Sequence, residues 1–150
     1  MELILWRHCD AVPGVPDELR PLTPLGMQDA ARMARWLAAR LPPDCRILVS
    51  PALRAQQTAQ ALGRAFDTDP ALASGTGVDA VLATAGWPDA LAPVLVVGHQ
   101  PTLGRLASLL VDGEAVDRSL RAGEVLWLAS RGAGDAAHAV LERSAAPDSV

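Results

Sequence analysis

Three short runs of apolar residues mark the first hundred positions of the chain. Residues 3–6, 47–49 and 94–97 are each continuously apolar, without the alternation of a strand that has one face in water. Such runs are typical of strands that are buried on both faces, as in a parallel sheet covered by helices. The pattern therefore predicts three central strands.

Segments with helical periodicity follow these runs. Apolar side chains recur at helical spacing between residues 24 and 41, until two consecutive prolines end the pattern. A Ser or Thr followed by Pro, which is favoured at a helix start, precedes this segment and also opens a second predicted helix at 50–66. A third helix is predicted from Pro101 to about residue 111. Residues 67–93 are ambiguous and contain at most one short helix, at about 78–85.

Two later apolar runs, 125–128 and 139–141, predict strands that pair antiparallel at an edge of the sheet. Strands that alternate with helices predict an α/β fold, a three-layer α/β/α sandwich with a mainly parallel sheet. Because no repeat or linker divides the chain, residues 1–150 are expected to form one domain without a cap insertion. Residues 145–150 are predicted to be a frayed tail.

Composition and charge exclude several classes of function. The net charge is −4 and no cluster of basic residues stands out, so we expect no nucleic-acid partner. No run approaches the roughly 18 apolar residues of a membrane span, and no signal peptide is found, so we expect no membrane partner and a cytoplasmic location. Cys9 and Cys45 match no disulfide framework or zinc pattern. Neither a metal nor a cofactor is predicted.

The polar residues that could carry chemistry follow the predicted central strands. Arg7 and His8 end the first run, Arg54 comes shortly after the second, and His99 follows the third. Ligands of open α/β sheets bind beyond the carboxyl ends of the strands, so we expect these four side chains to meet at one edge. Two guanidinium groups and a helix N-terminus favour an anion such as phosphate. Two imidazoles add a candidate nucleophile and a proton carrier.

The same residues lie in three ordered motifs. Arg7-His8, the segment Ser-Pro-Ala-Leu-Arg-Ala-Gln-Gln-Thr-Ala at 50–59, and Gly98-His99 resemble the motifs of the histidine phosphatase superfamily, the phosphoglycerate mutase-like enzymes. Within that superfamily the chain is most similar to the SixA group of phosphohistidine phosphatases. That group also carries Asp in the positions of Asp10 and Asp17, and the Arg-Pro-Leu-Thr found here at 20–23.

This resemblance implies a phosphoglycerate mutase-like fold and a hydrolase with a covalent phosphohistidine intermediate. His8 would be the nucleophile, and Arg7, Arg54 and His99 would bind the phosphoryl oxygens. Asp17 and Arg20 are further candidates for substrate binding, although an ion pair within their loop explains them equally well.

Cys9 is a departure from the family, which has Gly after the nucleophile. Cys would strain the loop if this position needs a positive φ, whereas a requirement for a small side chain alone would tolerate it. We expect Cys9 at the mouth of the pocket, with a pKa lowered by the nearby arginines. The Cys-x₅-Arg signature of cysteine phosphatases is excluded, because Val15 stands where that signature needs Arg.

The predicted activity is hydrolysis of phosphohistidine on a protein, such as a phosphorelay histidine domain. No convincing general acid is found, and an alcohol leaving group would need one. A phosphatase of small phosphate esters and a non-catalytic phosphate-binding domain remain as alternatives. The non-catalytic alternative predicts the loss of a catalytic residue, yet all four are present. A phosphomutase is disfavoured by the lack of an insertion that could close over a small substrate.

Overall fold

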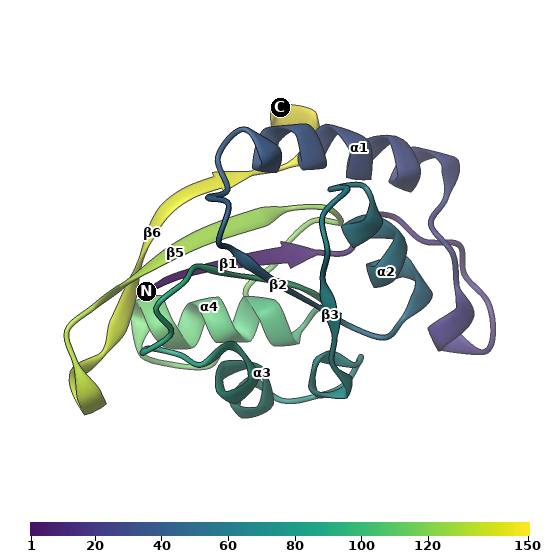
Figure 1. Cartoon of the computed structure of the whole chain (residues 1–150). Coiled ribbons are helices and arrows are strands. Elements are labelled where there is room, and N and C mark those ends of the chain that lie inside the picture. Colours follow the sequence, from purple (N-terminus) through teal and green to yellow (C-terminus); the bar gives the residue numbers. More distant parts are fainter.

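The computed structural model describes residues 1–150 and consists of a six-stranded sheet with helices on both faces (Figure 1). The strand order is β3-β2-β4-β1-β5-β6. Strands β3, β2, β4 and β1 are parallel, β5 is antiparallel to β1, and β6 is antiparallel to β5. The predicted α/β fold is thus confirmed, with a mixed sheet. The strands are β1 (Glu2–Arg7), β2 (Arg46–Val49), β3 (Asp67–Thr68), β4 (Val94–Gly98), β5 (Val125–Arg131) and β6 (His138–Ala145).

Two helices cover each face of the sheet (Figure 1). On one side lie α1 (Pro24–Ala38) and α2 (Leu53–Gln60), and on the other lie α3 (Val78–Ala85) and α4 (Thr102–Asp112). None of these helices has the length and apolar character needed to cross a membrane. Short 3-10 helices complete the chain: η1 (Asp17–Leu19), η2 (Pro70–Leu72), η3 (Gly134–Ala136) and η4 (Pro147–Ser149).

The continuous apolar runs of the central strands follow from this layering. Along β1, Leu3 and Leu5 pack in the core beneath α3 and α4, whereas Ile4 and Trp6 pack in the core beneath α1 and α2. All four side chains are fully buried. Each contributes on the order of 1.5–3 kcal/mol relative to an exposed side chain, so neither face of β1 tolerates a polar residue.

The helix boundaries differ from the prediction at two places. α1 begins at Pro24 with Thr23 as its N-cap, as predicted, but ends at Ala38 rather than at residue 41. The second helix spans only Leu53–Gln60 instead of 50–66. Its expected cap, Ser50, lies outside the helix and uses its hydroxyl for other hydrogen bonds.

The C-terminal residues do not fit the predicted frayed tail. Ala145 ends β6 and pairs with Val125, and the side chains of Ala145 and Ala146 are buried. Asp148 in η4 accepts a hydrogen bond of 2.8 Å from Arg121. A backbone ladder and an ion pair therefore hold this end of the chain against the sheet.

A close approach between two backbone segments fixes the start of α1 beside the end of β1. The carbonyl oxygen of Asp10 accepts a hydrogen bond from the Thr23 amide at 3.0 Å and lies directly against Gly26. A Cβ atom at Gly26 would overlap with this carbonyl group. Because the obstacle is backbone rather than a flexible side chain, relief requires the whole segment to move.

We therefore expect Gly26→Ala to lower the free energy of unfolding by about 1–3 kcal/mol, the usual cost of overpacking. Gly77→Ala is the matched control, because a Cβ at Gly77 meets no atom within 4 Å. Its effect should stay within about 1 kcal/mol. Urea unfolding followed by tryptophan fluorescence measures both values. Equal stabilities of the two variants would contradict the close approach.

Candidate active site

The carboxyl ends of β1, β2 and β4 bring the predicted residues together. β4 lies between β1 and β2, and Arg7 is in register with Gly98. The His8 amide donates to the Gly98 carbonyl at 3.1 Å, and the ring centroids of His8 and His99 are 5.1 Å apart. Arg54, in the first turn of α2, reaches the same edge. The structure thus places the four residues in one cluster.

The imidazole of His8 is held in one tautomer. Its Nδ1 lies 2.8 Å from the carbonyl oxygen of Cys9, and since a carbonyl can only accept, Nδ1 carries the proton. The lone pair is therefore on Nε2. Burial lowers the pKa of His8 to about 4, with smaller contributions from Arg54 and other arginines, against the opposing effect of the Cys9 carbonyl. His8 is neutral at pH 7 and its Nε2 is available as a nucleophile.

Arg54 is almost completely buried, with 3% of its surface exposed. Its Nη1 donates to the main-chain carbonyl of Asp17 at 2.8 Å, and its Nη2 donates to the Asp17 carboxylate at 3.0 Å. The buried Nε of Arg54 has no acceptor, and the same is true of the Nε of Arg7. Arg7 is held from the other side by the Leu120 carbonyl at 2.7 Å. Charged donors without acceptors are what an oxyanion such as phosphate would satisfy.

His99 links Arg54 to Ser50. Nη2 of Arg54 approaches Nδ1 of His99 at 3.3 Å, so Nδ1 is the acceptor and Nε2–H donates to the Ser50 hydroxyl at 2.7 Å. The Ala52 amide also donates to this hydroxyl, at 3.2 Å. Burial, with smaller contributions from His8 and Arg54, lowers the pKa of His99 to about 3. In the free site His99 is therefore neutral, and the Ser50 hydroxyl fixes its ring.

The sequence predicts Ser50 as a helix cap and does not predict its contact with His99. A signal was nevertheless present, because Ser50 comes directly after β2 just as His99 comes directly after β4. Parallel neighbouring strands place such residues side by side.

Asp17 and Arg20 form an ion pair within their loop. Arg20 Nη1 lies 3.0 Å from the Asp17 carboxylate, and Arg20 Nε donates to the Val12 carbonyl at 2.8 Å. Hydrogen bonds from Arg20 and then Arg54 lower the pKa of Asp17. Of the two explanations that the sequence left open, the structure contains the ion pair, and it adds a connection from Asp17 to Arg54.

Cys9 does not lie at the mouth of the pocket, contrary to the expectation. Its side chain is fully buried with Leu22 and Ala30, against Gly123. Burial raises the pKa of the Cys9 thiol to about 12, so a reactive thiolate is also excluded. No residue other than glycine has a positive φ, so Cys9 does not strain the loop. Its amide donates to the Thr58 hydroxyl at 3.0 Å, which supports the turn after His8.

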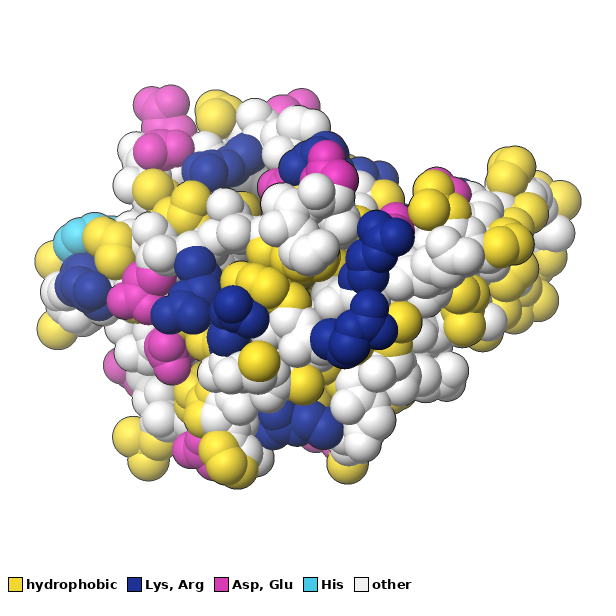
Figure 2. All heavy atoms as spheres, turned by 90° about the horizontal axis from the view of Figure 1, so that it is seen from above, with side chains coloured by type: hydrophobic (Ala, Val, Ile, Leu, Met, Phe, Trp, Pro, Cys, Tyr) yellow, Lys and Arg dark blue, Asp and Glu magenta, His cyan; other side chains and the backbone are white.

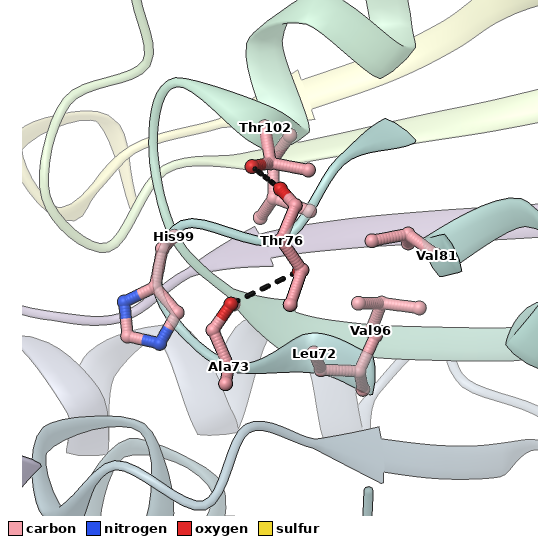
Figure 3. A pocket seen from close by; sticks show the side chains of 9 residues that line it. Leu72, Ala73, Thr76, Val81, Val96, His99 and Thr102 are labelled. Atoms are coloured by element: carbon pink, nitrogen blue, oxygen red, sulfur yellow. Dashed lines mark hydrogen bonds between the residues drawn. The ribbon is translucent and has the colours of Figure 1, made fainter. Parts of the chain in front are cut away.

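Two spaces adjoin the cluster. Behind His99 lies a cavity of about 10 Å³, roughly the size of one water, with Leu72, Val81 and Val96 on its walls (Figure 3). It contains no cationic group and does not suit an anion. On the other side a recess of about 140 Å³ separates η1 from the turn before α2. The recess is lined by Asp17, Glu18, Ser50, Pro51, Ala52, Ala73 and Ser74.

Known proteins share both the sequence motifs and this architecture. Residues 3–75 match the model of the histidine phosphatase superfamily (branch 1). The chain is 33% identical over 123 residues to the phosphohistidine phosphatase SixA of Escherichia coli, a match that covers 76% of each chain. The family-model match includes the first two motifs, at residues 7–8 and 50–59.

Solved structures extend the likeness to the whole chain. The structure of a protein histidine phosphatase SixA in complex with tungstate has a TM-score of 0.83 and 28% identity, covering 99% of this chain and 98% of that one. A provisionally assigned phosphohistidine phosphatase SixA from Nakamurella multipartitia has a TM-score of 0.82 and 32% identity, covering 97% and 95%. With the motifs, the fold and these relatives in agreement, the chain belongs to the histidine phosphatase superfamily.

Proposed function

We propose that this protein hydrolyses phosphohistidine on another protein, with His8 as the covalent nucleophile. The observation that carries the proposal is the neutral, buried imidazole of His8, whose Nδ1–H is hydrogen-bonded to the Cys9 carbonyl, beside two arginines whose Nε atoms have no acceptor. The E. coli relative is a phosphohistidine phosphatase, which supports the choice of substrate. The two cysteines are free and buried, which is compatible with the reducing cytoplasm where we place the reaction.

The reaction proceeds in two steps. Nε2 of His8 attacks the phosphorus atom, the P–N bond of the substrate breaks, and the released imidazole takes a proton from water. Water then attacks the phosphorus of phospho-His8, which releases inorganic phosphate and regenerates the neutral ring. Arg7 and Arg54 offset the negative charge on the phosphoryl oxygens in both steps. Once the anion is bound, its charge favours a proton on His99, which then donates a third hydrogen bond.

In this mechanism Asp17 and Arg20 act through Arg54. Asp17 takes two donors of the Arg54 guanidinium and leaves its Nε for the phosphoryl group. Arg20 in turn holds the Asp17 carboxylate. The orientation of a bidentate arginine is thereby fixed before substrate arrives, which lowers the entropy cost of binding.

The leaving group decides between phosphohistidine and phosphate esters. The carboxyl group bonded to the phosphate-binding arginine is Asp17, and its lowered pKa keeps it ionised, so it is a poor proton donor. The carboxylate of Asp10 accepts a hydrogen bond of 2.7 Å from Thr23 and is likewise occupied. An alcohol needs a proton from a general acid to leave, whereas imidazole, with a pKa of about 6.5, leaves readily and is protonated by solvent.

A phosphoenzyme should be trapped on His8. Rapid quenching with labelled substrate should give a protein-bound phosphate that is labile in acid and stable in alkali. His8→Ala should abolish the label and lower turnover by more than roughly 10³-fold, because the nucleophile is gone. His138→Ala is the matched control, since His138 is exposed. A His8→Ala enzyme with normal turnover would show that another residue carries the phosphoryl group.

Arg54→Lys should lose activity although the charge is kept. Lysine cannot reproduce the planar fork that contacts Asp17, His99 and the phosphoryl group at once. Turnover should fall by about 10²–10³-fold, as for the loss of one preorganised charged donor. Arg105→Lys, on the exposed face of α4, is the control and should leave turnover unchanged. Activity of Arg54→Lys within twofold of wild type would remove Arg54 from the mechanism.

The enzyme should prefer a phosphohistidine domain to phosphate esters. kcat/KM is measured under one set of conditions on a histidine-phosphorylated protein domain, on p-nitrophenyl phosphate and on phosphoserine. We expect a higher value on the domain than on phosphoserine, because the serine alcohol needs a general acid to leave, whereas imidazole and p-nitrophenolate do not. Phosphoserine that is hydrolysed faster than the domain would point to an acid in the site and to an ester as substrate.

A further inference from the structure

Exposed apolar side chains are concentrated on the segment between β1 and α1 and on the first turn of α1. Of ten large hydrophobic side chains that are exposed on the protein, five lie between residues 12 and 27. They are Val12 (37% exposed), Val15 (96%), Leu19 (64%), Leu25 (55%) and Met27 (50%). Figure 2 shows hydrophobic side chains gathered at the end of the molecule that this segment forms. Isolated exposed apolar residues are ordinary, but a concentration of them beside a functional site indicates an interaction surface.

We call Val12, Val15 and Leu19, with the exposed Pro13 and Pro16 between them, the apolar rim. Backbone hydrogen bonds hold the segment in place: Val12 donates to the Pro21 carbonyl at 2.8 Å and accepts from Arg20 at 2.8 Å. The Leu19 amide donates to the Pro16 carbonyl at 3.1 Å. The rim is therefore presented in a fixed conformation, and a partner that binds it loses little entropy in ordering it.

The rim is connected directly to the phosphate-binding residues. Asp17, within the same segment, binds Arg54 through both its main-chain carbonyl and its carboxylate. Asp17 and Glu18 also form one wall of the 140 Å³ recess, whose opposite wall is the turn that carries Ser50. Asp17 therefore connects the segment that carries the rim both to the recess and to Arg54.

Charge and shape together define the occupant. The unpaired Nε atoms of Arg7 and Arg54 favour a negatively charged phosphoryl group, and the rim favours contact with an apolar surface. A small ester or a free phosphorylated amino acid supplies the phosphoryl group but has no protein surface to cover the rim. A folded protein that carries its phosphohistidine next to exposed apolar side chains satisfies both parts at once.

We propose that the apolar rim is the docking surface for the phosphorylated protein substrate, and that it contributes affinity for that protein without taking part in the chemistry. The inference rests on the proposed function and identifies the residues that bind the protein part of the substrate. Val15 and Leu19 are the central contacts, because they are the most exposed of the rim's large side chains.

The test compares two variants on two substrates. Val15→Ser/Leu19→Ser removes the exposed apolar surface and leaves Asp17 and its contacts in place. Leu91→Ser is the matched control: Leu91 is fully exposed, and it lies with Met1 and Pro93 at the opposite ends of the strands. The substrates are a four-helix phosphotransfer domain phosphorylated on its histidine, and free phosphohistidine.

On the phosphorylated domain, the double variant should raise KM about tenfold or more with little change in kcat. On free phosphohistidine, its kcat/KM should stay within twofold of wild type. Leu91→Ser should match wild type on both substrates. This pattern would establish the rim as a docking surface.

Four results would overturn the inference. Unchanged kinetics of the double variant on the domain would show that the rim binds nothing there. An equal loss on both substrates would show that the segment acts only through Arg54. A dimer of the wild type that the double variant dissociates would assign the rim to a second copy of this chain. If instead the wild type cleaves free phosphohistidine but not the domain, the proposed protein substrate itself is wrong. The rim then has no protein substrate to bind.

Discussion

The buried guanidinium of Arg54 is the constraint on which the site depends. A charged group with 3% of its surface exposed costs several kcal/mol unless it is paired and hydrogen-bonded. In the free protein the pairing comes from Asp17, and this requirement holds the segment after β1 across the edge of the sheet. The position of η1, the ion pair of Asp17 with Arg20 and the recess beside Ser50 all follow from this contact. A phosphoryl group completes what Asp17 leaves unpaired.

The same burial and positive charge determine the protonation state of the imidazoles of His8 and His99. Burial and the neighbouring arginines disfavour a positive charge on either ring, so the pKa values of His8 and His99 lie far below the ordinary value of 6.5. For a nucleophile this is favourable, since an imidazolium has no lone pair to give. His8 thus needs no general base, only a carbonyl that fixes its tautomer. The arginines to which we assign phosphate binding thus also help to keep the proposed nucleophile neutral.

Much of this arrangement could be predicted from the sequence, because strand ends are visible as apolar runs that stop at polar residues. Arg7, His8, Arg54 and His99 were located in this way, and parallel pairing brought them together. The side-chain directions could not be predicted. Cys9 turns into the core, and Ser50 serves His99 rather than a helix. The directions of the Cys9 and Ser50 side chains depend on the backbone geometry of the turns, and turns show no hydrophobic periodicity from which a direction could be predicted. Asp17 was identified, but its role required the position of Arg54.

The proposed mechanism and the proposed docking surface assign catalysis and recognition to different parts of this fold. In that mechanism the part of the substrate that the arginines and histidines at the strand ends contact is the phosphoryl group, which every phosphate substrate has in common. They cannot by themselves distinguish one phosphorylated protein from another. Selectivity must come from groups outside the phosphate site, in two forms. The ionised Asp17 supplies no proton and so disfavours leaving groups that need one, which selects the type of bond. The apolar surface of Val15 and Leu19 lies next to Asp17 in the chain and, as the proposed docking surface, would contact the protein that carries that bond. In this proposal the loop after β1, which Arg54 holds in place, determines both which type of bond is cleaved and which protein is bound.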